Sequence, residues 1–391
     1  MRTWISSILL IAAVAVSSFG QSAASSCRLY LTLSDLDQKY DVMQEILSFD
    51  DRTLESFMAE SLDELVTGGL SSHKSDPATY DTWEKLTLSI IRELGDLEGR
   101  SAAATVWDVA RTTDSSVLKA DSYIALGNMG ATEYASDIAL ALRNLNFNTR
   151  NDADGAEAEA YGAVYALGKM KEAVGIEPLV YASLGWYHDK VTSLARTSVL
   201  SFSDGLEEHM SRIISDATDS RDKRRVLALM MDTEASAGSK GSVAVTALSE
   251  GLAYAESDAS LRRELANLRQ DAIRDLIELE ASAPNSPGLL DRAIDRGDQD
   301  EKLIAIQALG ADGGDAAVGV LIRRLNEFNA RQDAGVAVDQ EELAVLHKLI
   351  DALGDSGNEL GLEPLDDMRY YDYTNAVVRH ARRAAAQIRG E

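Results

Sequence analysis

The sequence contains a single cysteine, Cys27, and only 5 prolines among its 391 residues. One cysteine excludes an intramolecular disulfide and any metal site built from several thiolates. Few prolines, together with 6% aromatic residues, favour helices over the short strands and proline-rich turns of β-sandwiches. The chain is therefore expected to be all-α.

Groups suited to proton transfer are also few. The five histidines are scattered, and none has the spacing of a metalloprotease motif. Because distant residues of a repeat protein rarely meet, we expect these histidines not to converge on one site. No Gly-x-Ser-x-Gly elbow follows a predicted strand. The sequence thus predicts a non-catalytic protein without a cofactor or a metal. The histidines are His73, His188, His209, His347 and His380.

Residues 151–155 resemble half of a calcium-binding loop. Arg150 and Tyr161, however, occupy the positions of its first and twelfth ligands, where the loop requires oxygen donors. We therefore expect an acidic turn that caps a helix instead.

Basic residues are outnumbered, with 38 Lys+Arg against 64 Asp+Glu and a net charge of -26. Proteins bind nucleic acids mainly through basic patches, so a field this negative repels a phosphate backbone. The same argument disfavours anionic lipid. Two interpretations of the acidity remain open, namely a basic partner protein or a surface that only maintains solubility.

The first twenty residues differ from the rest of the chain. Arg2 supplies a positive start, Ile5 to Val16 form an apolar run, and residues 18–20 provide the small residues of a cleavage site. This pattern predicts a secretory signal peptide at residues 1–20, with cleavage as late as residue 26. It indicates export to a bacterial periplasm or cell envelope, and an uncleaved membrane anchor is the alternative.

Cys27 follows the Ala- and Ser-rich end of this segment, where a bacterial lipoprotein carries its acylated cysteine. Ala24 and Ser26 depart from the residues usual before such a cysteine. Two interpretations therefore remain. Cys27 is either a lipidation site, and then the only tie to a membrane, or an unpaired thiol near a processed terminus.

A short sequence motif recurs along the chain, in which a stripe of apolar residues at helical spacing ends in Leu-Gly. Intervals of 41 residues from Gly127 to Gly168 and 44 from Gly310 to Gly354 predict a repeating unit of two helices. We expect each glycine to end the first helix in the left-handed conformation, which glycine adopts without steric cost. The occurrences are Leu94-Gly95, Leu126-Gly127, Leu167-Gly168, Leu309-Gly310 and Leu353-Gly354.

The second helix of two units begins in the same way, with Gly-Ile-Glu-Pro-Leu at 175–179 and Gly-Leu-Glu-Pro-Leu at 361–365. Pro178 and Pro364 each lie ten residues beyond a Leu-Gly glycine. Proline is favoured in the first turn of a helix, where its missing N–H would have no helical partner.

The Ala-Leu-Gly triplets at 125–127, 166–168, 308–310 and 352–354 resemble the turn of the HEAT-repeat family, including its bacterial HEAT-like, armadillo-type variants. The resemblance covers roughly residues 80–391 and is strongest near 115–185 and 300–390. It implies a right-handed α-solenoid of stacked antiparallel helix pairs that binds partners along its surface.

Three segments are predicted after the signal peptide. Residues 28–80 are predicted to be an N-terminal helical cap that ends in a loop from Thr67 to Thr79. Residues 81–280 form a HEAT-like array with degenerate units in its middle, including one long helix from Leu261 to Leu279. Residues 281–391 form C-terminal repeats after a hinge that contains Pro284 and Pro287.

Two aromatic clusters follow second helices, Trp186 with Tyr187 and Tyr370 with Tyr371 and Tyr373. Tyrosine and tryptophan are enriched at binding hot spots, so these residues are the candidate partner-binding positions, with packing between repeats as the alternative. The sequence predicts an exported, non-catalytic scaffold for protein–protein interaction. The competing hypothesis is an envelope enzyme or ligand carrier that uses an acidic groove.

Overall fold

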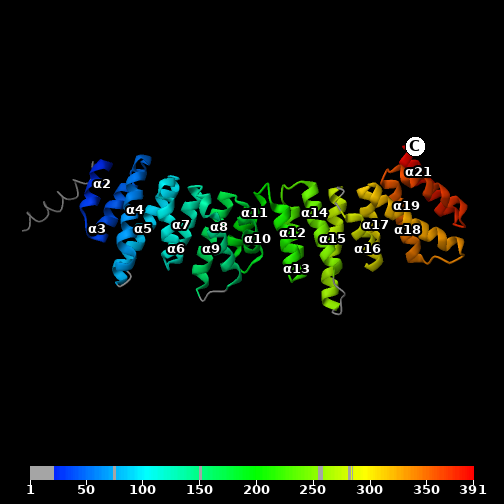
Figure 1. The fold of residues 1–391 in the computed structure, drawn as a ribbon, viewed down its shortest axis with the longest axis horizontal. Coiled ribbons are helices and arrows are strands. Elements are labelled where there is room, and N and C mark those ends of the chain that lie inside the picture. Colours follow the sequence, from blue (N-terminus) through cyan, green and yellow to red (C-terminus); the bar gives the residue numbers. More distant parts are fainter. Residues whose placement is uncertain (1–21, 74–75, 149–151, 254–258, 281–282, 284) are drawn as a thin grey trace, which may run out of the picture. The chain divides into compact units, whose positions relative to one another are not determined.

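The computed structural model describes residues 22–391 except 74–75, 149–151, 254–258, 281–282 and 284. The predicted signal peptide, residues 1–20, lies outside the described residues. These contain twenty α-helices, labelled α2 to α21, six short 3₁₀-helices and no strand (Figure 1). The prediction of an all-α protein is confirmed.

The chain divides into two compact units, the first ending at Ser198 and the second beginning at Val199. The predicted hinge at 281–288 lies within the second unit. The first unit contains α2 (Ala23–Thr32), α3 (Leu36–Leu47), α4 (Glu55–His73), α5 (Pro77–Asp96), α6 (Ala103–Thr112), α7 (Ser116–Asn128), α8 (Ala135–Phe147), α9 (Ala153–Met170), α10 (Ile176–Leu184) and α11 (Asp189–Leu200), whose last two residues belong to the second unit.

The second unit contains the remaining ten helices. They are α12 (Leu206–Asp216), α13 (Ser220–Met231), α14 (Ala237–Ala253), α15 (Ala259–Leu279), α16 (Ser286–Arg296), α17 (Gln299–Asp312), α18 (Asp315–Asp333), α19 (Gln340–Asp355), α20 (Leu362–Asp367) and α21 (Asn375–Arg389). The bounds of α15 confirm the long helix predicted from Leu261 to Leu279.

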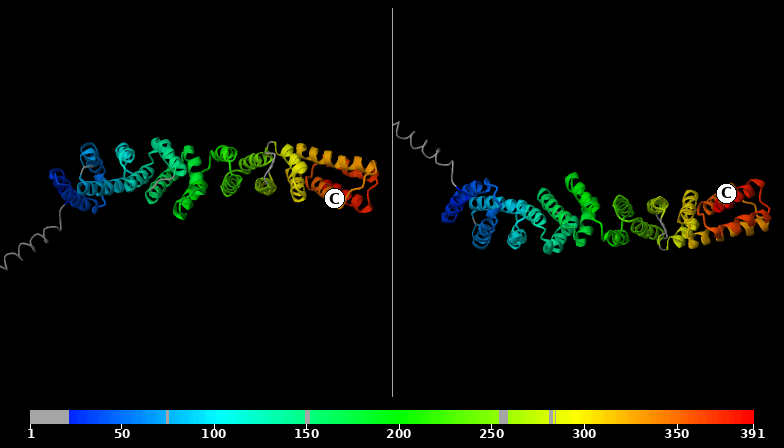
Figure 2. Two further views of the ribbon diagram at one scale, coloured as in Figure 1. Left: turned by 90° about the horizontal axis from the view of Figure 1, so that it is seen from below. Right: turned by 90° about the horizontal axis from the view of Figure 1, so that it is seen from above.

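Within each unit, helices pack against the next helix but one. We call α3, α5, α7 and α9, and α13 to α21 with odd numbers, the odd series, because each packs on the following member (Figure 2). The even series contains the helices between them, in which α4 packs on α6, α8 on α10, and α12, α14, α16, α18 and α20 pack in turn.

The Leu-Gly glycines do not end helices, contrary to the prediction. All five lie inside α5, α7, α9, α17 and α19 of the odd series. The left-handed residue follows three positions later in every case, and it is not always glycine. These residues are Glu98, Gly130, Lys171, Gly313 and Gly357, with φ between 54° and 62°.

Close packing between odd helices explains the glycines instead. A Cβ added at Gly127 would lie 2.7 Å from the Cα of Ala166, and one at Gly95 would lie 2.9 Å from the Cα of Ala125. In the second unit, a Cβ at Gly310 would lie 2.9 Å from the Cα of Ala352. The alanine and the glycine of the triplet therefore form contacts between successive repeats, since Ala125, Ala166 and Ala352 each fill the space left by the glycine of the previous repeat.

The leucine of each Leu-Gly pair lies in the core of its unit. Leu94, Leu126, Leu167, Leu309 and Leu353 are all fully buried. Burying one leucine side chain stabilises a fold by about 1.5–3 kcal/mol, so these positions contribute strongly in every unit.

The connection to the even helix is also repeated. In four units the left-handed residue is followed by a 3₁₀-turn, and the even helix starts directly after that turn. Pro178 and Pro364 are the third residues of α10 and α20, as predicted for the first turn. These turns are η2 (Arg100–Ala102), η3 (Thr132–Tyr134), η4 (Ala173–Gly175) and η5 (Glu359–Gly361).

The loop predicted from Thr67 to Thr79 is wrong for most of its length. Helix α4 continues to His73, and α5 already begins at Pro77 behind its capping residue Asp76. Two adjacent glycines in a helix cost about 1 kcal/mol each, and packing of Leu62 and Leu65 in the same helix offsets this cost. No helix in the described part of the chain is both long enough and apolar enough to span a membrane.

Candidate functional site

The aromatic residues after α10 are held against α8 in the first unit. The hydroxyl of Tyr187 donates a hydrogen bond to Asn146 Oδ1 at 3.0 Å, and Trp186 Nε1–H donates to the carbonyl of Leu145 at 3.4 Å. Asn146 Nδ2 in turn donates to the carbonyl of Pro178. Tyr187 is 5% exposed, whereas Trp186 is 40% exposed. Burial raises the pKa of Tyr187 well above its usual value.

The same contact occurs in the second unit, where the hydroxyl of Tyr373 donates to Asn329 Oδ1 at 3.0 Å. Tyr187 and Tyr373 each lie 19 residues beyond a Leu-Gly glycine, and so do Asn146 and Asn329. Equivalent positions of successive repeats within one unit therefore contact each other. Burial raises the pKa of Tyr373 to about 12. Both tyrosine hydroxyls lie in the packing between successive repeats of the same unit.

The remaining predicted tyrosines are more accessible. Tyr370 is 71% exposed, and the guanidinium of Arg369 lies 4.6 Å from its ring centroid. Tyr371 packs edge to face on Tyr373 with ring centroids 6.4 Å apart. Of the five predicted residues, Trp186 and Tyr370 therefore present the most ring surface to solvent.

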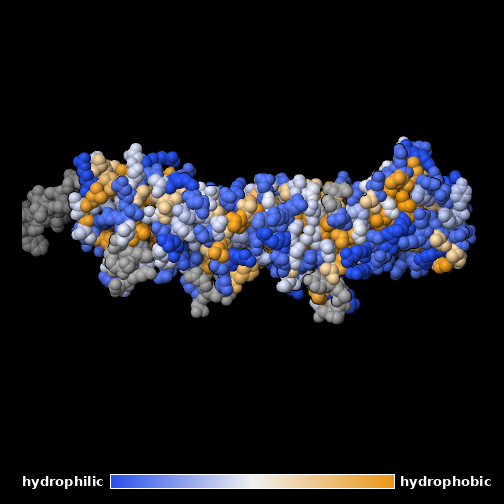
Figure 3. Space-filling model, in the orientation of Figure 1, coloured by the Kyte–Doolittle hydropathy of each residue, from blue (hydrophilic) through white to orange (hydrophobic). Residues whose placement is uncertain are grey.

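Trp186 has exposed apolar neighbours on the same part of the first unit. Phe147, the last residue of α8, is 59% exposed and packs edge to face on Tyr181 of α10 at 4.9 Å. Leu140, two turns earlier in α8, is 57% exposed. We call Leu140, Phe147, Tyr181 and Trp186 the aromatic surface. Figure 3 shows hydrophobic residues in several separate groups on the face that it draws.

Sequence reasoning missed Phe147 and Leu140, although a pattern in the sequence marks them. Ile138, Leu142 and Leu145 form the buried stripe of α8, and Leu140 and Phe147 fall outside that stripe. Their spacing of seven residues places both on a second, outer face of the helix. Apolar residues at helical spacing on an outer face favour binding rather than core packing.

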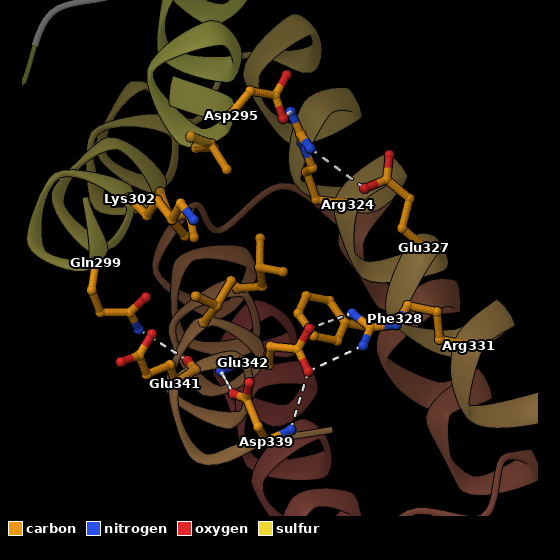
Figure 4. Close-up of a pocket in the computed structure, with 14 residues that line it drawn as sticks. Asp295, Gln299, Lys302, Arg324, Glu327, Phe328, Arg331, Asp339, Glu341 and Glu342 are labelled. Atoms are coloured by element: carbon orange, nitrogen blue, oxygen red, sulfur yellow. Dashed lines mark hydrogen bonds and ion pairs between the residues drawn. The ribbon is translucent and has the colours of Figure 1, made fainter. Parts of the chain in front are cut away.

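The second unit contains a cavity of about 310 Å³ between α16, α17, α18 and α19 (Figure 4). We call it the slot. Apolar and charged side chains from all four helices line it. The apolar ones are Ile294, Ile306, Phe328, Val345 and Leu349. The polar ones are Asp295, Gln299, Lys302, Arg324, Glu327, Arg331, Asp339, Glu341 and Glu342.

Most charges of the slot are already paired. Arg331 donates to both carboxylate oxygens of Glu342 at 2.8 and 3.1 Å, and Glu342 closes a capping box with Asp339 (Figure 4). The bond from Arg331 lowers the pKa of Glu342. Arg324 donates to Asp295 at 2.6 Å. Because these charges are already paired with one another, the geometry suits binding better than proton transfer.

Lys302 and Glu341 differ from the other charged residues of the slot. Within the described part of the chain, neither side chain has a hydrogen-bond or ion-pair partner. Gln299 Nε2 donates to the main-chain carbonyl of Glu341 at 2.9 Å, which leaves the Glu341 carboxylate free (Figure 4). The slot therefore offers one cation and one anion beside apolar side chains.

Two histidines meet in the second unit, contrary to the prediction that none would converge. The Nδ1 atoms of His347 in α19 and His380 in α21 lie 2.7 Å apart, and the rings stack at 4.9 Å. His380 Nε2 lies 2.5 Å from Asp351 Oδ1. The two histidines are 33 residues apart and occupy neighbouring odd helices, so the spacing of one unit brings them together. Burial and the His380 charge lower the pKa of His347.

The described residues contain no group of three or more His, Cys, Asp or Glu side chains that could hold a metal ion. Part of the calcium-like segment lies outside the described residues. Asp152, which is described, caps α9 by accepting a hydrogen bond from the main-chain N–H of Gly155. That capping role agrees with the acidic turn expected from the sequence.

Cys27 lies in α2 and is half-buried, and burial raises the pKa of its thiol. Lipidation at this position stays a prediction. Comparison of the sequence with protein-family models gave no match, and no curated protein matched it either.

Proposed function

We propose that the protein is a helical-repeat scaffold that binds another protein through the aromatic surface of its first unit. The proposal rests on the way Trp186 is presented. Hydrogen bonds from Trp186 to Leu145 and from Tyr187 to Asn146 fix the indole, while 40% of Trp186 stays exposed. A rigid aromatic side chain offers contact area at a small entropic cost, which is typical of a hot spot.

Phe147 extends this surface on the neighbouring helix. Its ring is 59% exposed, and Tyr181 supports it from α10. Desolvation of both aromatic rings by a partner would supply most of the affinity, because hot spots cluster in the centre of an interface. The net charge of -26 favours a partner with complementary basic residues and disfavours nucleic acid.

A right-handed solenoid of antiparallel helix pairs is the arrangement we propose for each unit. Its support is the repetition of one contact, in which a glycine of one odd helix receives an alanine of the next. Repetition of an identical contact generates a stack, and stacked helix pairs provide long surfaces for partners. HEAT-like membership is proposed on the same ground, together with the Ala-Leu-Gly triplets.

Export is part of the proposal and rests on the N-terminal sequence pattern. A cleaved signal at residues 1–20 would place the scaffold in a periplasm or cell envelope, and acylation at Cys27 would tether it to a membrane. Mass spectrometry of the native protein distinguishes a free N-terminus after cleavage from an acylated Cys27.

A ligand carrier is the second candidate, because the slot has the volume of a small binding site. Its paired charges suit holding a ligand more than transforming one.

Photocrosslinking in the native cell tests the scaffold proposal. A photoreactive residue at position 147 should give a discrete adduct with one protein, and Trp186→Ala in the same chain should abolish that adduct. Leu360, which is 51% exposed in the second unit, is the control position and should not give it. Absence of an adduct at 147, or the same adducts at both positions, would contradict the proposal.

A further inference from the structure

Lys302 occupies an unusual position in the slot of the second unit. It lies in the first turn of α17, where the positive end of the helix dipole disfavours a cation. Its side chain is half-buried and lines the cavity beside Ile306 (Figure 4). The described part of the chain supplies no carboxylate within ion-pair distance of its Nζ, so this charge is available to a ligand that enters the cavity.

The other cations of the slot are neutralised. Arg331 is paired with Glu342, and Arg324 is paired with Asp295 and with Asp291, 2.8 Å away. Three cations thus line the cavity, and Lys302 alone has no counter-charge from the described residues. Residues that break a local rule without compensation from the fold are often found at functional sites.

The surroundings define the charge that the ligand can carry. Asp295, Glu327 and Glu341 stand around the slot, so a dianion such as a phosphate monoester would be repelled. A single carboxylate can approach Lys302 with less repulsion. The apolar side chains beside it require that the carboxylate be attached to an apolar group.

The polar groups at the slot also suit an amide. Gln299 donates from Nε2 to the main-chain carbonyl of Glu341, and this bond fixes the orientation of the Gln299 side chain (Figure 4). The Oε1 atom of Gln299 can then accept a hydrogen bond from an N–H group of a ligand. A chain-terminal apolar residue combines the three features required, namely a carboxylate, an apolar side chain and an amide N–H. A cavity of about 310 Å³ is near the lower limit of ligand sites, which suits one terminal residue.

We propose that the slot binds the C-terminal residue of a polypeptide that ends in an apolar side chain, with Lys302 Nζ donating to the terminal carboxylate. The apolar side chain contacts Phe328, Val345 and Leu349. This site is separate from the aromatic surface of the first unit and goes beyond the scaffold function proposed for that surface.

Ligand-observed NMR on the full chain tests the proposal with N-acetyl-L-leucine as the probe. N-acetyl-L-leucinamide is the matched control, because it keeps the acetyl group and the leucine side chain and replaces the charged carboxylate by a neutral amide. The acid should bind at least tenfold more tightly than the amide, since hydrogen bonds between charged groups are about twice as strong as neutral ones. This comparison uses the unaltered protein, and its result does not depend on whether the aromatic surface of the first unit binds a protein.

Substitutions then test whether Lys302 is the residue that recognises the carboxylate. Lys302→Met should remove the preference for the acid, and Lys302→Arg should keep it. Lys348→Met is the control, because Lys348 donates to Gln307 and does not line the slot. Equal binding of acid and amide, no binding of either, or a preference that survives Lys302→Met would overturn the proposal. Tighter binding of octanoate than of N-acetyl-L-leucine would overturn the assignment to a polypeptide terminus.

Discussion

Gly127 and Ala166 lie so close together that a Cβ at position 127 would be 2.7 Å from the Cα of Ala166. The obstacle is main chain, which cannot rotate away as a side-chain end can. The contact joins α7 to α9 and has counterparts between Gly95 and Ala125 and between Gly310 and Ala352. The spacing of the odd helices is therefore set by residue size at these positions.

Gly127→Ala should destabilise the first unit, because the added methyl group forces α7 and α9 apart. Overpacking of this kind costs about 1–3 kcal/mol and outweighs the gain in helix propensity. Gly319→Ala is the matched control, since Gly319 lies inside α18 with nothing within 4 Å of the added atom. Its stability should stay the same or rise by about 0.5–1 kcal/mol. Urea unfolding of both variants checks this, and equal effects would contradict the packing explanation.

Tyr187→Phe should destabilise the protein by about 1–2 kcal/mol, because the oxygen of Asn146 loses its donor within the packing between units. Tyr370→Phe should change stability by less than about 0.5 kcal/mol, since that ring is mostly exposed. A double-mutant cycle of Tyr187→Phe with Asn146→Ala measures the pair directly. Additive effects would show that the two side chains are not coupled.

A buried ion pair links α15 to α17 in the second unit. Arg269 Nε donates to Glu301 Oε1 at 2.6 Å, and the two residues are 7% and 1% exposed. Glu301→Ala should therefore cost about 3–5 kcal/mol, because the buried guanidinium loses the carboxylate that accepts two of its hydrogen bonds. Arg269→Met combined with Glu301→Leu should recover most of that loss in thermal unfolding. A double variant as unstable as Glu301→Ala would disprove the argument.

The free energy of unfolding should decrease as the pH falls below about 6.5, because His347 then takes up a proton more readily in the unfolded chain. Burial and His380 lower the pKa of His347 from its usual 6.5, so the unfolded chain takes up this proton before the folded chain does. The stabilising contribution is complete above pH 6.5 and is lost as the pH falls from 6.5 through the lower pKa of the folded state. Unfolding experiments at pH 7.5 and 5.5 should show a smaller loss for His347→Gln than for the wild type. An identical loss in both proteins would exclude His347 as the cause.

The repeat was predictable because its leucines and glycines recur at the interval of two helices. The role of the glycines was not, since a glycine near a helix end fits both a left-handed cap and a close helix contact. The residues three positions later are glycine in three cases but Glu98 and Lys171 in the other two, so residue type alone does not identify the helix ends. Helix α4 also continues across two adjacent glycines, because tertiary packing outweighs their low helix propensity.

The candidate sites were predictable only in part. Trp186 and Tyr187 are adjacent in sequence and equally aromatic, yet one is exposed and the other is bonded to Asn146. Counting from each Leu-Gly glycine would have paired Tyr187 with Asn146, since both hold the same position in their units. The slot could not be foreseen, because its lining comes from four helices whose packing the sequence pattern does not define.

The central claim is that the exposed aromatic surface of the first unit holds a protein partner. The most direct measurement is the dissociation rate of the partner identified by crosslinking at position 147. Phe147→Ala combined with Trp186→Ala should raise that rate at least tenfold with unchanged helicity, while Tyr370→Ala leaves it unchanged, because buried anchors act mainly on the lifetime of a complex. Association should also slow as salt rises if the partner is basic. An unchanged dissociation rate in the Phe147 and Trp186 double variant would contradict the account.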